Sequence, residues 1–171
     1  MILEGELVRL RPATIDDLTA YTRWYTDPEF RRYMSQGDDV IAALTSPTAG
    51  EVYFSVETGD GRLIGLVYVT HVRTSNRNCD LGYVGIGERD CWGQGFGTEM
   101  VKLTLRFCFQ ELGMHLVHIR TVEFNERARR CYAAIFPHQQ RHRQWVWEES
   151  RFWDEIYFDI TEEEFEKLEA G

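Results

Sequence analysis

Three glycines alternate within a short stretch near the middle of the chain, Asp90-Cys-Trp-Gly-Gln-Gly-Phe-Gly-Thr-Glu-Met100, at positions 93, 95 and 97. An apolar run typical of a strand precedes this stretch, and a helical pattern follows it. Glycine lets backbone N–H groups approach a ligand without a Cβ in the way. The first turn of a helix adds unpaired N–H donors and the positive end of the helix dipole. The pattern therefore predicts a binding site for a phosphate or pyrophosphate group.

Two well-known phosphate motifs do not fit this stretch. A Walker A loop ends in Gly-Lys-Ser/Thr, whereas here the ending is Gly97-Thr-Glu, with no lysine. A dinucleotide fingerprint has a different glycine spacing and sits among repeated strand–helix–strand units that run from the N-terminus. The glycines alone leave two interpretations open, an anion site or a turn that merely starts a helix.

The surrounding pattern predicts one α/β domain over residues 1–171, with the glycine turn at its centre. Alternation of apolar residues predicts strands over 7–10, 52–58, 63–72, 81–86, 116–124, 144–147 and 152–160. Helical spacing predicts helices over 14–26, 28–34, 96–112 and 125–133, and a last acidic helix that Thr161 and Glu164 begin as a capping box. The stretch between residue 34 and residue 52, rich in Ser, Thr, Pro and Gly, is expected to be a looser segment.

Composition narrows the class of protein. The chain has 171 residues, of which 43% are hydrophobic, and this suffices for a full core. Its net charge of −9 argues against sequence-independent binding to nucleic acid or to anionic membranes. The four cysteines, at positions 79, 91, 108 and 131, show neither Cys-x-x-Cys spacing nor a zinc pattern with histidines, so we expect free thiols, no metal and a cytoplasmic location. We expect no signal peptide, because the first residues carry acids, and no apolar run approaches the ~20 residues of a membrane helix.

A second motif lies about 30 residues beyond the glycine turn and reads Asn125-Glu-Arg-Ala-Arg-Arg-Cys-Tyr132. With this pair of motifs the chain resembles the GNAT superfamily of acyl-CoA N-acyltransferases, and within it the branch that contains the Rim-type ribosomal-protein N-acetyltransferases. In that branch the loop looks like Tyr-Trp-Gly-Lys-Gly-Tyr-Gly/Ala-Thr-Glu-Ala, and the second motif is Asn-x-x-Ala/Ser-x-x-x-Tyr. The resemblance covers nearly the whole chain, from Leu7-Val-Arg-Leu to Ser150-Arg-Phe-Trp-Asp-Glu.

The resemblance implies the GNAT fold, which is a single mixed, mostly antiparallel sheet of about six to seven strands flanked by helices. A V-shaped split is expected between the fourth and fifth strands, which here are 81–86 and 116–124. The implied cosubstrate is acetyl-CoA, and the implied reaction is direct transfer of its acetyl group to a primary amine. The residues implied to bind the cofactor are Val84, Gly85, Ile86, Trp92, Gly93, Gln94, Gly95, Phe96, Gly97, Thr98, Asn125 and Arg130.

The strand with Gly82, Gly85 and Gly87 would pair with the pantetheine arm, which resembles a strand through its amides. Its glycines suggest a β-bulge that re-aims a backbone N–H toward the thioester oxygen. The alternative is an ordinary strand weakened by glycine. Asn125 is also a good cap for the short helix that follows it.

Tyr132 resembles the general acid of the family, which protonates the departing CoA thiolate, although a core tyrosine is the alternative. For the general base the resemblance suggests Asp80, which stands where this branch often has a glutamate. Glu123, His71, His118 and a water relay remain open as other bases.

The acceptor site is expected to be walled by Trp24, Tyr25 and Tyr33, unless these rings only pack against the sheet. The acceptor would be a protein N-terminus or a small-molecule amine, and the protein a monomer or homodimer. After Tyr132 the chain reads Ala-Ala-Ile-Phe-Pro137, where the family has Glu-Lys-x-Gly-Phe. This departure supports a second hypothesis, a non-catalytic acyl-CoA-binding module.

Overall fold

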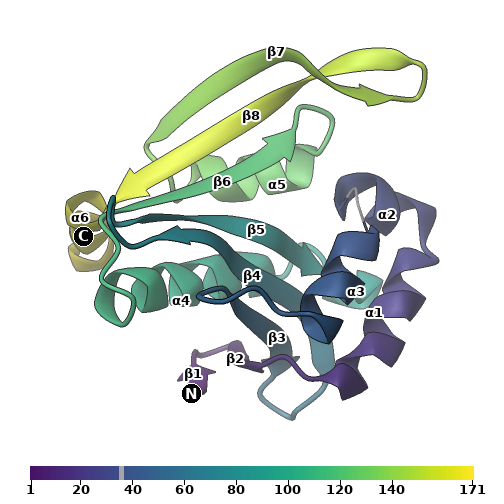
Figure 1. Ribbon diagram of the computed structural model, residues 1–171, viewed down its shortest axis with the longest axis horizontal. Coiled ribbons are helices and arrows are strands. Elements are labelled where there is room, and N and C mark those ends of the chain that lie inside the picture. Colours follow the sequence, from purple (N-terminus) through teal and green to yellow (C-terminus); the bar gives the residue numbers. More distant parts are fainter. Residues whose placement is uncertain (35–36) are drawn as a thin grey trace.

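Eight strands form one sheet in the computed structural model, which describes residues 1–34 and 37–171 (Figure 1). Their order across the sheet is β1-β2-β3-β4-β5-β6-β8-β7, and every neighbouring pair is antiparallel except β5 and β6. The strands are β1 (Leu3–Glu4), β2 (Val8–Pro12), β3 (Val52–Thr58), β4 (Leu63–Arg73), β5 (Asn78–Ile86), β6 (Leu116–Val122), β7 (His138–Glu148) and β8 (Arg151–Thr161). The mixed, mostly antiparallel sheet predicted from the sequence is confirmed.

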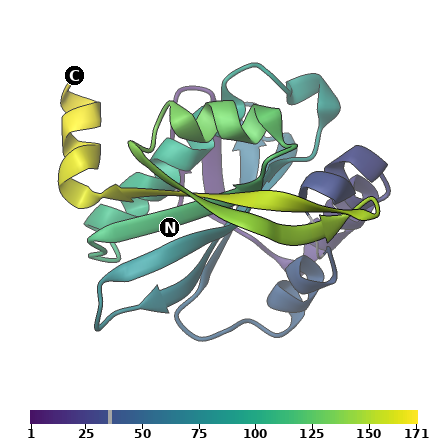
Figure 2. The same ribbon diagram turned by 90° about the horizontal axis from the view of Figure 1, so that it is seen from above.

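Helices cover both faces of this sheet (Figures 1 and 2). They are α1 (Leu18–Tyr25), α2 (Pro28–Met34), α3 (Gly37–Thr45), α4 (Phe96–Gln110), α5 (Glu126–Ala133) and α6 (Glu162–Ala170), with short 3-10 turns η1 (Ile15–Asp17) and η2 (Arg89–Cys91). Apolar residues of α4 and α5 share the larger core cluster with the sheet, and those of α1, α2 and α3 share a second cluster. The helices therefore pack on the sheet in two separate groups.

The sheet opens between its two parallel strands. β5 and β6 pair only from Asn78↔Leu116 to Leu81↔Ile119. Beyond that point β5 continues to pair with β4 and β6 with β8, so the two strands separate as Figure 1 shows. This is the predicted V-shaped split, and it leaves the N–H and C=O groups of β5 after Leu81 without a strand partner on that side.

A β-bulge lies at the start of the split. Val67 pairs with Val84 and Val69 pairs with Leu81, so Gly82 and Tyr83 oppose the single residue Tyr68. The extra residue changes which face the next side chains occupy. The bulge predicted in this strand is confirmed.

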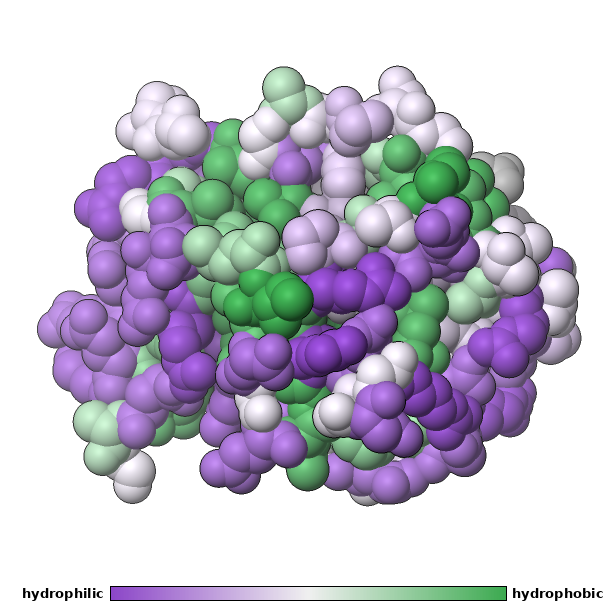
Figure 3. Space-filling model, turned by 90° about the horizontal axis from the view of Figure 1, so that it is seen from below, coloured by the Kyte–Doolittle hydropathy of each residue, from purple (hydrophilic) through white to green (hydrophobic). Residues whose placement is uncertain are grey.

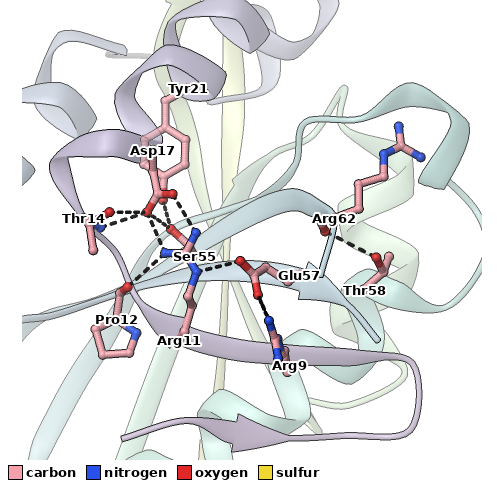
Figure 4. Close-up of polar contacts among 10 residues, drawn as sticks. All are labelled: Arg9, Arg11, Pro12, Thr14, Asp17, Tyr21, Ser55, Glu57, Thr58 and Arg62. Atoms are coloured by element: carbon pink, nitrogen blue, oxygen red, sulfur yellow. Dashed lines mark hydrogen bonds and ion pairs between the residues drawn. The ribbon is translucent and has the colours of Figure 1, made fainter. Parts of the chain in front are cut away.

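A buried polar network attaches η1 and α1 to the sheet (Figure 4). The Arg11 guanidinium donates two hydrogen bonds to the Asp17 carboxylate, at 2.7 and 2.8 Å, and a third to Glu57. Ser55 Oγ donates to Asp17 Oδ2 at 2.7 Å and also contacts the Tyr21 hydroxyl. Burial opposes ionisation of Asp17, but these hydrogen bonds outweigh it and hold its pKa below the usual value. The network fixes η1 and α1 against strands β2 and β3.

The β7–β8 hairpin extends across the open side of the sheet and reaches α2 (Figures 1 and 2). Arg32 on α2 forms an ion pair of 2.8 Å with Glu149 in the hairpin turn. The same guanidinium lies 3.9 Å above the ring of Phe124. Glu149 and Ser150 have φ values of 52° and 60°, as a tight two-residue hairpin requires.

Several sequence predictions need correction. α3 occupies residues 37–45 of the segment expected to be loose, while residues 35–36 of that segment lie outside the described residues. The hairpin strand expected over 144–147 begins at His138, and β1 was not predicted. The capping box of α6 is confirmed, with Glu164 N donating to Thr161 Oγ1 at 3.3 Å.

The surface seen from below is mostly hydrophilic, and its hydrophobic side chains appear in separate groups (Figure 3). Among the described residues, no helix combines the length and the apolar character needed to cross a membrane.

Candidate active site

The glycine turn has the backbone that the sequence predicted. Gly93 and Gly95 have φ values of 72° and 89°, a region that side chains disfavour, and Gly95 caps the N-terminus of α4. The first intrahelical hydrogen bond runs from Glu99 N to Gly95 O at 3.0 Å. The amides of Phe96, Gly97 and Thr98 therefore precede the helical ladder. They present N–H donors and the positive helix end to the space in front of the turn.

A cavity of about 400 Å³ lies against this turn, and we call it the loop-side cavity. The end of β5, the glycine turn, the start of α4 and one face of α5 enclose it. Ten of the twelve residues predicted to bind the cofactor line this cavity: Val84, Gly85, Ile86, Trp92, Gly93, Gly95, Gly97, Thr98, Asn125 and Arg130. The structure thus brings two distant motifs to one site.

The side chains of the other two predicted cofactor residues are not among the lining residues. Gln94 Nε2 donates back to the carbonyl oxygen of Asp90 within the turn. The ring of Phe96 packs against the larger core cluster. Only their backbone amides remain in the turn that borders the cavity.

Arg127 belongs to the second motif, and the structure places it at the glycine turn. Its guanidinium lies 3.7 Å above the ring of Trp92, whose Nε1 donates to the carbonyl oxygen of Ile86 at 2.7 Å. Arg127 and Arg130 both line the loop-side cavity, and Arg130 forms an exposed ion pair with Glu126 at 3.3 Å. Two cations therefore border a site that already offers N–H donors to an anion.

A second cavity, of about 450 Å³, lies on the other side of the split beneath the β7–β8 hairpin, and we call it the hairpin-side cavity. Its walls come from β4, β5, β6, α2, α5 and both hairpin strands. The charged or titratable residues that line it are His71, Asp80, His118, Arg120, Glu148 and Glu155. The rings that line it are Tyr33, Tyr83, Tyr132, Trp145, Trp147 and Tyr157.

Five residues line both cavities: Tyr33, Met34, Val84, Asn125 and Tyr132. The two cavities therefore meet at the split, between β5 and the face of α5 that extends from its cap Asn125 to Tyr132. Asn125 caps α5, because its Oδ1 accepts a hydrogen bond from Ala128 N at 3.2 Å. A ligand that extends from the glycine turn along β5 would end beside a second ligand at this junction.

Tyr132 is 5% exposed, and its ring packs edge-on against Phe136 and Phe158 at 6.2 and 5.8 Å between centroids. Burial raises the pKa of its phenol far above the usual value, so it stays protonated at neutral pH. A protonated phenol at the junction is able to donate a proton to a leaving group.

The chain after Tyr132 does not need the glycine of the family motif. α5 ends at Ala133, and Ile135 N and Phe136 N both donate to the carbonyl oxygen of Tyr132, at 3.0 and 2.8 Å. Ile135 and Phe136 are buried in the larger core cluster. Buried apolar residues thus hold this corner, and Tyr132 keeps its place at the junction.

Asp80 lines the hairpin-side cavity but lies in the closed part of the split, paired in register with His118. Its carboxylate is 3.2 Å from His71 Nδ1 and 3.4 Å from Arg73 Nη1. Glu123, another candidate base, instead forms an ion pair with Arg141 at 3.0 Å and does not line either cavity.

The three aromatic residues expected to wall the acceptor site lie in different surroundings. Tyr33 lines both cavities, and its ring stacks on Phe124 at 6.3 Å. Trp24 and Tyr25 belong to the second core cluster and line neither cavity. Trp24 Nε1 donates to Glu88 at 2.8 Å, and its ring fills the space that a Cβ on Gly87 would occupy.

Cys131 also lines the loop-side cavity, 3.5 Å from the Thr98 hydroxyl. Burial raises the pKa of its thiol, so it is a neutral wall rather than a nucleophile. Within residues 1–34 and 37–171, no group of three or more His, Cys, Asp or Glu side chains is placed to hold a metal ion.

Comparisons with known proteins agree with this geometry. The family model of the acetyltransferase (GNAT) domain matches residues 8–135. An uncharacterized SPbeta prophage-derived N-acetyltransferase of Bacillus subtilis, YokL, is 27% identical over 117 residues. That alignment covers 68% of this chain and 65% of the relative, so the chain spans just under two thirds of the length of the curated relative it matches.

Solved structures share the fold over nearly the whole chain. A spermidine N-acetyltransferase chimera from Vibrio cholerae and hSSAT matches with a TM-score of 0.81 at 18% identity, covering 94% of this chain and 98% of the other. The spermidine N-acetyltransferase of Vibrio cholerae in complex with CoA and spermine matches with a TM-score of 0.78 at 18% identity, covering 94% and 99%. At this identity the likeness establishes the fold alone.

Proposed function

This chain belongs to the GNAT acetyltransferase family, and we propose that it transfers the acetyl group of acetyl-CoA directly to a primary amine. The observation that carries the proposal is the pair of cavities that meet at Tyr132. One cavity has the donors that a pyrophosphate needs, and the other is polar and aromatic, as an amine site requires. The split between β5 and β6 joins them, so a thioester and an amine can meet without a covalent enzyme intermediate.

Acetyl-CoA would occupy the loop-side cavity. The amides of Phe96, Gly97 and Thr98 would bind the pyrophosphate, with Arg127 and Arg130 near its negative charges. The pantetheine arm would run along β5 and pair with the N–H and C=O groups that β6 leaves free after Leu81. The bulge at Gly82 and Tyr83 would turn a backbone N–H toward the thioester oxygen, where it stabilises the developing negative charge.

Two proton transfers complete the reaction. The amine must lose a proton to attack, and we propose that Asp80, which lines the acceptor side with His71 at 3.2 Å, accepts it directly or through water. The departing CoA thiolate must gain a proton, and the protonated phenol of Tyr132 lies at the junction where the thioester would end. Tyr33 would wall the acceptor at the same junction.

A non-catalytic acyl-CoA-binding module is the other hypothesis. Its support was the altered sequence after Tyr132, but the buried Ile135 and Phe136 hold that corner without the glycine. Both hypotheses predict acetyl-CoA binding, and acetyl-CoA at ~100 times its Kd should add about 2.7 kcal/mol to the free energy of unfolding. They differ in whether the protein transfers the acetyl group and releases free CoA.

The deciding experiment measures free thiol released from acetyl-CoA in the presence of a panel of primary amines and of peptides with free N-termini. We expect amine-dependent release and an acetylated product by mass spectrometry. Stabilisation by acetyl-CoA without any release would support the binding module. A melting curve unchanged by millimolar CoA and acetyl-CoA would contradict both hypotheses.

We also propose that the chain lies in the Rim-type branch of the family, which Trp92 at the start of the loop and the Ser150-Arg-Phe-Trp-Asp-Glu segment support. A cytoplasmic location is proposed on the four free thiols at positions 79, 91, 108 and 131.

A further inference from the structure

Glu155 is a buried carboxylate that the reaction above does not use. It lies on β8 opposite Val122 of β6 and His142 of β7, it is 8% exposed, and it lines the hairpin-side cavity. Its Oε1 forms a long ion pair of 3.7 Å with Arg120 Nε, a distance too long for a hydrogen bond. Its Oε2 is buried, and within the described part of the chain no donor bonds to it.

A buried carboxylate oxygen without a donor is unfavourable, and native proteins rarely leave one so placed outside a functional site. A ligand that brings its own N–H donors and a positive charge into the cavity would remove this penalty. The complementary ligand group is therefore an ammonium or another cationic nitrogen.

The walls around Glu155 suit a cation with an alkyl chain. Tyr157 lines the cavity, and its ring stacks at 4.3 Å between centroids on His142, which itself contacts Trp145 edge-on at 5.6 Å. Trp145 and Trp147 line the cavity although they are 65% and 60% exposed, so their faces remain available at its mouth. Aromatic faces attract cations and also cover methylene groups.

The position of Glu155 indicates which part of an acceptor it would bind. The proposed thioester lies beside β5, and β6 stands between β5 and β8 in the sheet. Neighbouring strands are about 4.8 Å apart, and here β5 and β6 diverge, so Glu155 lies at least about 10 Å from β5. Moreover, the attacking amine must be neutral, whereas a buried carboxylate favours a protonated amine.

We propose that Glu155 binds a second, non-reacting ammonium group of the acceptor, so that the preferred substrates are linear diamines or polyamines. This inference rests on the proposed acetyl transfer for the identity of the reacting end. The carboxylate would hold one end of the chain under the hairpin, while the other end reaches the junction beside Tyr132.

The test compares three acceptors of equal length, 1,5-diaminopentane, pentylamine and 5-aminopentanoate, in the full-length protein. We expect the diamine to have a kcat/KM about 10- to 100-fold above that of pentylamine, with the carboxylate-bearing acceptor lowest. Glu155→Gln should lower kcat/KM for the diamine by the same factor and leave pentylamine within about twofold. Glu155→Asp keeps the charge one methylene further back, so it should shift the optimum toward a longer diamine.

Asp159→Asn is the matched control, because Asp159 lies on the same face of β8 and does not line the cavity. It should leave the diamine preference unchanged. Calorimetry of 1,5-diaminopentane with the CoA-bound protein gives a readout that needs no turnover, and Glu155→Gln should weaken this binding about 10-fold or more. Glu155-dependent diamine binding without acetylation would refute the proposed function but keep this inference. Equal use of diamine and monoamine by the wild type, or equal loss of both in Glu155→Gln, would overturn it.

Discussion

Gly97→Val tests whether the turn before α4 binds the pyrophosphate. Gly97 lines the loop-side cavity, and the nearest atom to a Cβ built at this position is Ile86 Cγ1 at 3.9 Å, an ordinary van der Waals contact. The side chain therefore fits the apo protein. Valine is a slightly better helix former than glycine, so we expect the free energy of unfolding to change by less than about 1 kcal/mol.

Ligand binding should change far more than stability. The branched side chain would stand in front of the amides of Phe96, Gly97 and Thr98, which are the donors that precede the helical ladder. A hydrogen bond to a charged group contributes about 1.5–3 kcal/mol, so the loss of two such bonds costs about 3–6 kcal/mol. The Kd for CoA should then rise about 10²- to 10⁴-fold.

Isothermal titration calorimetry with CoA measures the Kd, and chemical denaturation of the apo protein measures its stability. Gln94→Ala is the control, because the Gln94 side chain belongs to the same turn but bonds to Asp90 and does not line the cavity. It should leave the Kd within about twofold. An unchanged Kd in a folded Gly97→Val protein would mean that the pyrophosphate binds elsewhere.

Three further variants address the proton donor, the base and the network that supports α1. Tyr132→Phe removes only the hydroxyl and should lower kcat about 10²- to 10³-fold with an unchanged CoA affinity; near wild-type turnover would make Tyr132 a core residue only. Asp80→Asn should lower kcat/KM by about 10²-fold at neutral pH, and an unaltered rate would move the base to His71, His118 or water. Asp17→Asn should lower the free energy of unfolding at pH 7 by about 3 kcal/mol, because the partly buried Arg11 loses one of its two carboxylate partners. The folded pKa of Asp17 lies below its unfolded value, so this stability is present above about pH 4 and is lost as the pH falls through the folded pKa. The gap between wild type and Asp17→Asn in denaturation curves should therefore narrow below pH 4, and a constant gap would contradict the assignment.

The cofactor side of the site was largely predictable from sequence, because its signals are local. Alternating glycines before a helical pattern fix a turn and a helix N-terminus within a few residues, and Asn125 is a cap for the residues that directly follow it. The V-shaped split was implied by the resemblance rather than by any pattern in the two strands. The bulge was indicated by Gly82, although Gly87 is explained by its contact with Trp24.

The acceptor side was much less predictable, because it depends on register and on contacts between distant segments. Residues 155–160 of β8 alternate between polar and apolar, so the sequence indicates two faces but not which face borders a cavity. The register that pairs Glu155 with Val122 determines that the face with Glu155 borders the hairpin-side cavity. Similarly, Trp24 and Tyr33 are both aromatic residues of neighbouring helices, and only the packing of those helices separates a core ring from a cavity wall.

The two cavities take their lining residues from different parts of the chain. The loop-side cavity is built from residues 84–134 apart from three side chains of α2, whereas the hairpin-side cavity also needs both strands of the β7–β8 hairpin. The hairpin touches α2 through the Arg32–Glu149 ion pair and contributes no residue to the loop-side cavity. Under the proposed function, substitutions at the exposed rings of this hairpin that line the cavity, Trp145 and Trp147, can therefore alter acceptor choice while cofactor binding is inherited unchanged.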